Sequence, residues 1–177
     1  MPNRLVDLIR SYASVVAVSR LRRNHGLEHA TLHVLGERFP RQSFAGHSNL
    51  NGFWLLAELP LEAVQAAVEE GLRRLRAGDR RLAVHPNCGT NLVVGGTIAG
   101  LAGAASMLGV GPRWRDKLER LPLAASLATL GLILAQPLAL KLQKELTTSG
   151  EPGELELVKI LPSPRGRFTA YQVITRG

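Results

Sequence analysis

Two stretches without a charged residue decide the fold class: CGTNLVVGGTIAGLAGAASMLGVGP (residues 88–112) and LPLAASLATLGLILAQPLAL (residues 121–140). A bilayer core about 30 Å thick requires about 20 mostly apolar residues in a helix, and each stretch is long enough. A helix on the surface of a soluble domain needs a polar face, which both stretches lack. We therefore expect two transmembrane helices, residues 92–111 and 121–140. A hairpin buried in a soluble core is the open alternative.

Small residues favour close packing of these two helices against each other. Gly96 and Gly100 have the GxxxG spacing, which lets helix backbones approach closely in a membrane. The short connection, residues 112–120, makes the pair a helical hairpin. Because a hairpin returns the chain to the side that it left, the segments before residue 91 and after residue 146 should meet on one membrane face.

The remainder of the chain alternates between helical and extended patterns. Hydrophobic spacing and the positions of Pro and Gly predict helices over residues 4–39 and 60–77. Short strands are expected at residues 43–46, 52–59, 81–85, 155–161 and 168–175. We expect one helix-rich α+β domain, residues 1–177, with the hairpin inserted between the strands at residues 81–85 and 155–161. Residues 1–91 would form the metal-binding part, and residues 147–177 a C-terminal β-hairpin that packs on it.

The charge pattern favours a membrane surface over nucleic acid as the partner. The net charge of +8 is spread along the chain, and only four Phe, two Tyr and two Trp could stack on bases. Basic residues beside a membrane helix, which bind anionic lipids, explain the excess more simply. We expect membrane lipid as a partner and no nucleic acid. Salt-dependent nucleic-acid binding would contradict this expectation.

The ends of the chain and its cysteine content indicate the compartment. The first ten residues hold three charges and no apolar core of the kind that a signal peptide needs. Cys88 is the only cysteine, which excludes an internal disulfide and suits a reducing compartment. We expect a multi-pass protein of the cytoplasmic (inner) membrane, with its soluble part in the cytoplasm.

Residues 24–33, NHGLEHATLH, form the first candidate metal motif. At about 100° per residue, Glu28, His29 and His33 lie about −60°, +40° and +80° from His25 around the helix. Two imidazoles four residues apart can share one tetrahedral ion, and a carboxylate beside them can act as a base. The pattern His-x-x-Glu-His is also the inverted zinc-protease signature. A face of ordinary hydrogen-bonded histidines is the alternative, and His47 we assign to a surface loop.

Residues 85–91, HPNCGTN, form the second motif. His85 and Cys88 flank a tight turn in the manner of a zinc knuckle, in which Pro fixes φ and Gly permits an unusual backbone. Imidazole and thiolate together favour zinc, and iron less strongly, over magnesium or calcium. The alternative is a turn that leads into a membrane helix, with Cys88 as a small buried side chain.

The two motifs resemble those of a known bacterial family. His-Gly-x-Glu-His, followed by His-Pro-x-Cys-Gly-Thr at the start of an apolar helix, is similar to the YqhQ-like membrane proteins, which are uncharacterised predicted metal-dependent enzymes. The fuller Asn-His-x-Leu-Glu-His-Ala-Thr pattern, with Thr-Thr-Ser-Gly after the second apolar helix, looks closer to a smaller domain-of-unknown-function relative. The resemblance implies metal binding by His25, Glu28, His29, His85 and Cys88 in a membrane setting. It implies no substrate.

Two functions are compatible with these residues. In the first, the protein is a zinc-dependent hydrolase at the membrane surface, with Glu28 as general base and a lipid or peptide substrate. His33 and the polar residues that enter and leave the hairpin would then line the rim of the site: Thr90, Asn91, Thr147, Thr148 and Ser149. In the second, a closed site of His25, His29, His85 and Cys88 stabilises a scaffold or interaction protein.

Overall fold

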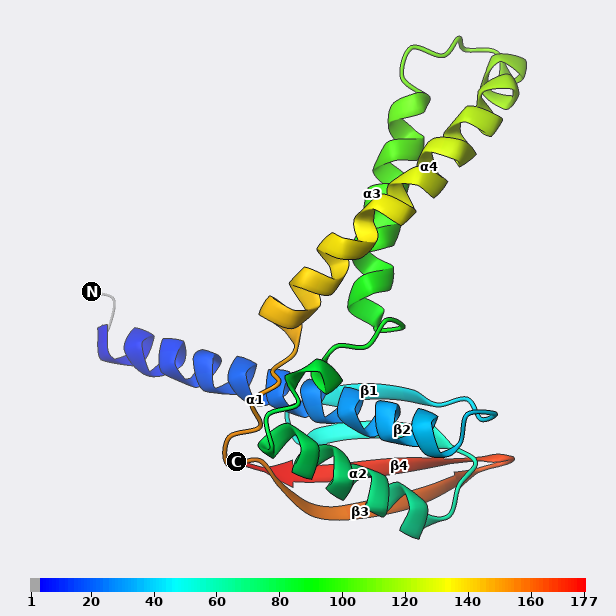
Figure 1. The fold of residues 1–177 in the computed structure, drawn as a ribbon. Coiled ribbons are helices and arrows are strands. Elements are labelled where there is room, and N and C mark those ends of the chain that lie inside the picture. Colours follow the sequence, from blue (N-terminus) through cyan, green and yellow to red (C-terminus); the bar gives the residue numbers. More distant parts are fainter. Residues whose placement is uncertain (1–3) are drawn as a thin grey trace. The chain divides into compact units, whose positions relative to one another are not determined.

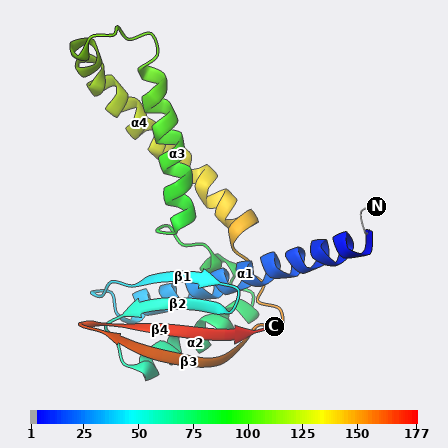
Figure 2. The ribbon, with the colours of Figure 1, turned by 180° about the vertical axis from the view of Figure 1, so that it is seen from behind.

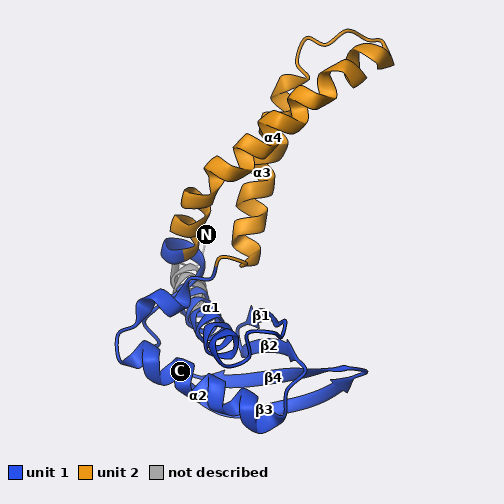
Figure 3. Cartoon of the chain, turned by 45° about the vertical axis from the view of Figure 1, so that its right-hand side comes forward, with its two compact units in different colours: residues 1–85, 144–177 blue, residues 86–143 orange. Residues whose placement is uncertain are grey.

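The computed structural model describes residues 4–177, with side chains from Val15 onward. The chain divides into two compact units: residues 1–85 together with 144–177, and residues 86–143 (Figure 3). The expected single domain is thus built of two units, and the first segment of the first unit ends at His85 rather than at residue 91. Each unit is described by itself.

The first unit is a two-layer α+β structure. Helices α1 (Arg4–Arg38) and α2 (Leu61–Arg76) cover one face of an antiparallel sheet, and the other face is seen in Figure 2. The sheet has the strand order β1-β2-β4-β3, with β1 at Ala45–Asn49, β2 at Gly52–Ala57, β3 at Glu156–Arg165 and β4 at Phe168–Arg176. The central pair, β2 and β4, joins the N-terminal and C-terminal parts of the chain.

The hydrophobic pattern of α2 accounts for the core of this unit. Apolar residues at spacings of three and four face the sheet and are buried, namely Val64, Ala67, Val68, Leu72 and Leu75. Pro60 precedes the helix as its N-cap, and Gly78 follows it with φ of +94°, a backbone region that favours glycine. The stripe packs against Leu27 and Val34 of α1 and Phe53 and Val173 of the central strands.

The prediction of a strand at residues 81–85 is wrong. Arg80–Ala83 form a 3-10 helix, η1, so the described residues contain a four-stranded sheet. The carbonyl groups of Ala83 and Val84 accept hydrogen bonds from histidine side chains of α1 instead of pairing with a strand. Consequently the helical hairpin is inserted between β2 and β3.

Two strand boundaries also differ from the expectation. His47 lies within β1, opposite Trp54, and not in the turn, which is formed by Leu50 and Asn51. Its side chain is exposed, as expected. Strand β3 continues through Pro162 and Pro164, because an edge strand tolerates residues that lack an N–H donor.

The second unit is a hairpin of two helices, α3 (Gly89–Ser106) and α4 (Trp114–Leu142), which lie side by side (Figure 1). A π-helical turn, η2 (Gln143–Thr147), continues α4. Within the described residues, one helix, Trp114–Thr147, is long and apolar enough to cross a membrane. Helix α3 does not reach that criterion, because glycines contribute little apolar surface and its first turn holds the polar Thr90 and Asn91. The expectation of two such helices is therefore met by one.

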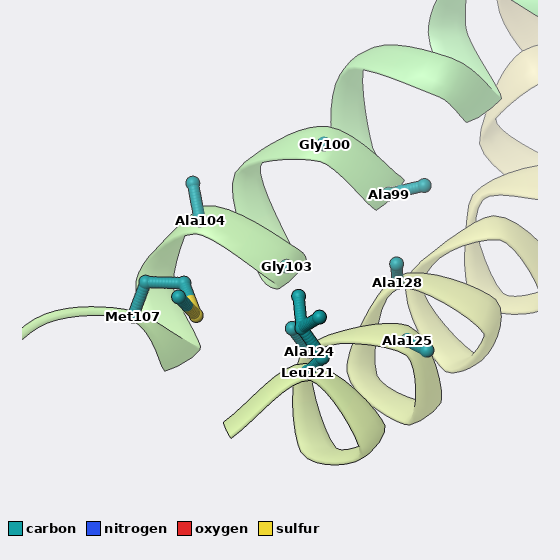
Figure 4. A pocket seen from close by; sticks show the side chains of 9 residues that line it. All are labelled: Ala99, Gly100, Gly103, Ala104, Met107, Leu121, Ala124, Ala125 and Ala128. Carbon is teal, nitrogen blue, oxygen red and sulfur yellow. The ribbon is translucent and has the colours of Figure 1, made fainter. Parts of the chain in front are cut away.

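Gly95 and Gly131, and not the GxxxG pair, lie in the contact between α3 and α4. A side chain at Gly95 would meet Leu132, and one at Gly131 would meet Ala102 and the backbone of α3. A side chain at Gly96 or Gly100, by contrast, would meet nothing within 4 Å. The GxxxG pair thus lies outside the helix contact. Gly100 lines an open groove of about 540 Å³, together with small residues such as Ala99, Gly103 and Ala128 (Figure 4).

Candidate metal site

Four histidines of the first unit form one cluster, which we call the histidine cluster: His25, His29, His33 and His85. The first three follow each other at intervals of four residues on α1, and His85 comes two residues after η1. The ring centroids of His25 and His29 are 4.4 Å apart, those of His29 and His85 5.7 Å, and those of His33 and His85 5.0 Å. The cluster unites predicted metal ligands with His33, which was predicted only for the rim.

Hydrogen bonds to backbone carbonyl groups determine which ring nitrogen carries the proton in three of these histidines. The Nδ1 of His25 lies 2.9 Å from the carbonyl oxygen of Thr147, and the Nδ1 of His29 lies 2.8 Å from that of Ala83. A carbonyl oxygen only accepts, so in both rings Nδ1 must carry the proton and donate. The lone pair of each neutral ring is then on Nε2. In His33 the arrangement is reversed, because Nε2 donates to the carbonyl of Val84 at 2.9 Å.

The pair His25 and His29 has the geometry of two ligands to one ion. One ring nitrogen of each lies within 4.8 Å of the other. His29 is 2% exposed, so its ring is held in a fixed orientation inside the protein. Metal-binding histidines in proteins characteristically donate the second ring N–H to a carbonyl or carboxylate, which orients the ring and makes the ligand nitrogen more basic.

The segment that follows the hairpin lies along α1 beside His25. Besides the carbonyl of Thr147, which binds His25, the backbone N–H of Ser149 donates to the carbonyl of Arg22 at 2.9 Å. The guanidinium of Arg22 in turn donates to the carbonyls of Glu145 and Thr148. The predicted rim residues Thr147, Thr148 and Ser149 therefore lie next to His25, in a segment whose backbone binds α1.

Gly26 makes this close approach feasible. A Cβ atom at position 26 would overlap the carbonyl oxygen of Ser149. Helix α1 continues through Gly26 without a break. A glycine between two histidines on a helix was the available signal for a neighbouring backbone at this point.

Glu28 faces strand β1. Its side chain is 4% exposed, and its Oε2 accepts a hydrogen bond from the hydroxyl of Ser48. Its carboxyl group packs against Gly46, where a Cβ atom would overlap it. Sequence reasoning found Glu28 but missed Ser48 and Gly46, because strand pairing brings them there and no local spacing indicates it.

The remaining predicted residues belong to the second unit. Cys88 is the N-cap of α3 and comes three residues after His85 in the chain. Thr90 and Asn91 lie in the first turn of α3, where the side-chain amide of Asn91 donates to the carbonyl of Pro86 at 2.9 Å.

The fold and the site define a class: a helix-rich α+β protein with an inserted helical hairpin and a histidine cluster on its first helix. The chain belongs to a family described as a domain of unknown function, DUF6391, which matches residues 20–160 and so includes both motifs. The resemblance to a domain-of-unknown-function family is thus confirmed. Neither this family nor the similar protein described next supports the YqhQ-like name or a metal-dependent enzyme.

One known protein is similar in sequence to most of this chain. An uncharacterised protein of Picosynechococcus sp. is 35% identical over 139 residues, which is 73% of this chain and 66% of the relative. The chain thus matches slightly less than two thirds of that protein's length. No solved structure matches the chain.

Proposed function

We propose that this protein is a membrane-embedded metal-binding protein whose ion is held first by Nε2 of His25 and Nε2 of His29. The observation that carries the proposal is the pair of hydrogen bonds from Nδ1 to the carbonyls of Thr147 and Ala83. These bonds place the lone pairs of both rings on Nε2, the nitrogens that would bind the metal.

His85 and Cys88 are the proposed remaining ligands. The His85 ring already lies against His29, and Cys88 follows His85 after a two-residue turn. A set of imidazoles with one thiolate suits zinc, and iron less well. His33 would support His85 through their ring contact rather than bind the ion itself.

The hairpin is proposed to cross the membrane twice. Helix α4 is long and apolar enough, and its outer side chains are exposed, as at Leu130 (50%) and Leu134 (65%). The chain on both sides of the hairpin belongs to one unit, since β2 pairs with β4. A single crossing would separate these strands, so if α4 crosses, α3 must cross as well. We place the first unit on the cytoplasmic face of the inner membrane, with lipid as the partner.

A hydrolytic reaction is the proposed activity. In a hydrolase, three of the four proposed ligand side chains would hold the zinc, and the open fourth position would supply a Lewis acid. Glu28 would take a proton from the attacking water as general base, with Ser48 holding one carboxylate oxygen in place. Burial of Glu28 beside Gly46 restricts its movement, which suits a group that must be positioned before reaction.

A structural site in a scaffold protein is the second candidate. The observation that favours it is the rigid packing of the four rings, each against another, with three of them anchored to backbone carbonyls. In that case His25, His29, His85 and Cys88 would close the coordination sphere, and Glu28 would only stabilise α1 against β1.

Metal analysis of the detergent-purified full-length protein, prepared without chelators, tests the proposal. We expect about one zinc per chain, and we expect His29→Ala to lose it because a ligand is missing. His47→Ala is the matched control, because His47 is exposed on β1 and should leave the metal content unchanged. A wild-type protein without metal, or equal loss in both variants, would overturn the proposal.

A further inference from the structure

The hairpin contains a pocket lined by three carboxamide side chains, which we call the carboxamide pocket. It has a volume of about 350 Å³, within the range of small-molecule sites, and lies between the beginning of α3 and the C-terminal half of α4. Its polar lining comes from Asn87, Asn91 and Gln136. Leu92, Leu132 and Leu140 supply most of its apolar lining.

The position of Gln136 is unusual for an apolar helix. It lies inside the uncharged stretch 121–140, followed directly by Pro137. Among the described residues, no protein group forms a hydrogen bond with its carboxamide. Polar groups within a membrane span are costly and characteristically mark functional sites. The carboxamide lines the pocket, where a ligand could satisfy both its donor and its acceptor.

The chemistry of the lining selects the class of ligand. No ionisable side chain lines the pocket, so a phosphate or carboxylate would enter without a compensating charge, at a high cost in desolvation. The Gln136 carboxamide offers both N–H donors and a carbonyl acceptor, which suit hydroxyl, ester and amide groups. The leucines suit a hydrocarbon chain.

We propose that the carboxamide pocket binds a membrane lipid with an uncharged head, through its hydroxyl, ester or amide groups, and the first part of its acyl chain. The inference rests on the proposed membrane crossing of the hairpin.

Photolabelling of the full-length protein in detergent tests this inference. The probe is a monoacylglycerol with a diazirine in its acyl chain, and labelled peptides are identified by mass spectrometry. We expect labelling to concentrate on residues 91–95 and 132–140. Unlabelled monoacylglycerol should compete, whereas the fatty acid and the lysophosphatidate of the same chain length should not.

Matched variants distinguish specific binding in the pocket from non-specific association of lipid with the hairpin. Gln136→Leu should weaken competition about fivefold, the effect of one lost hydrogen bond. Thr97→Val, which replaces a polar group of α3 outside the pocket, should not change it. Labelling spread evenly over the hairpin, or unchanged in Gln136→Leu, or displaced equally by the charged lipids, would overturn the inference.

A metal-free variant keeps this test independent of the proposed metal site. His29→Ala should retain the labelling pattern, because the pocket lies entirely within the second unit. Specific labelling with no metal in the wild type would refute the metal proposal and leave the lipid pocket standing. Metal in the wild type together with unspecific labelling would refute the lipid pocket and leave the metal proposal standing.

Discussion

Gly26 couples the position of the Ser149 backbone to the orientation of His25. We expect Gly26→Ala to displace residues 147–149, because the added Cβ would overlap the Ser149 carbonyl. The hydrogen bond between His25 and Thr147 would then be lost, and zinc affinity should fall about 10–100-fold. Competition with a chromophoric chelator measures this change.

Gly36 provides the control on the same helix. A Cβ atom at position 36 meets nothing within 4 Å, and the position is exposed. Gly36→Ala should therefore leave zinc affinity unchanged and raise the free energy of unfolding by up to about 1 kcal/mol. Equal zinc affinity in both variants would show that the segment after the hairpin does not support His25.

Glu28 distinguishes the hydrolase from the scaffold. Glu28→Gln keeps the shape and can still accept a hydrogen bond from Ser48. In a hydrolase it should retain zinc and lower the rate of cleavage of an uncharged acyl ester by about 10²–10⁴-fold. Zinc content and ester cleavage are measured on the same preparation.

Two outcomes would reject the role of Glu28 as general base. One is loss of zinc in Glu28→Gln, which would make Glu28 a ligand or an essential support of one. The other is a cleavage rate equal to that of the wild type. Ser48→Ala serves as a companion variant, since it removes the hydrogen bond and retains the carboxylate.

The histidines were predictable from sequence because a helix has a fixed period. Spacings of four residues place His25, His29 and His33 on one face whatever the rest of the chain does. The partners of these residues were not predictable. Ala83, Thr147 and Ser48 reach α1 through tertiary packing, and two of them contribute only a backbone carbonyl, a group that every residue has.

At the scale of the element, α2 carries a charge cluster with a defined pH response. Arg73 donates to Glu70 at 2.9 and 2.8 Å, and Arg74 donates to it at 2.7 Å. These hydrogen bonds lower the pKa of Glu70 from its ordinary value of 4.5 to about 2. A lowered pKa in the folded state means that the stabilisation is present above pH 4.5 and is lost as the pH falls toward about 2.

The carboxyl carbon shift of Glu70, followed by NMR titration, tests this response. We expect a midpoint near pH 2 in the wild type and a return toward 4.5 in Arg73→Gln, because the strongest hydrogen bonds are removed. A midpoint near 4.5 in the wild type would show that the ion pairs of α2 do not persist in solution.

Helix α4 carries the test of membrane insertion. The protein should stay with the membrane fraction after carbonate extraction. Leu130→Lys places a charge at the centre of the apolar stretch, which costs about 2.5–3.5 kcal/mol and should reduce the retained fraction. Leu118→Lys is the control, because Leu118 lies beside Lys117 and is 48% exposed, against 50% for Leu130. This variant should leave the retained fraction unchanged.

Release of the wild-type protein by carbonate would contradict membrane insertion, as would equal behaviour of both variants.

The sequence predicted both helices of the hairpin because long uncharged stretches exclude most alternatives. The GxxxG spacing did not identify the contact, since helical phase decides which glycines face the partner helix. A period of 3.6 puts adjacent glycines such as Gly95 and Gly96 about 100° apart.

At the scale of the whole molecule, the pairing of β2 with β4 constrains topology. Because the strands before and after the hairpin share a sheet, both ends of a hairpin that crosses the membrane must start from one side. On the proposed orientation, with the first unit in the cytoplasm, a green fluorescent protein fused to the C-terminus should fluoresce there. Alkaline phosphatase inserted at Gly111, in the connection between α3 and α4, should be active outside it.

The opposite pattern of activities would reverse the orientation. An inactive phosphatase at Gly111 together with a cytoplasmic C-terminus would mean that the hairpin does not cross the membrane.

The α+β class was predictable from the alternation of hydrophobic patterns. The strand count was not. Residues 81–85 have strand-like composition, but their carbonyls are occupied by His29 and His33, a long-range contact that outweighs local propensity.

The X-ray absorption spectrum of the zinc-loaded, full-length protein tests the central claim most directly. We predict two or three nitrogen ligands at about 2.0–2.1 Å, with the outer-shell scattering of imidazole, and one sulfur at about 2.3 Å. His29→Ala should lose one imidazole or all of the zinc, and Cys88→Ser should lose the sulfur. A spectrum with only oxygen ligands, or one unchanged in both variants, would contradict metal binding by the histidine cluster and Cys88.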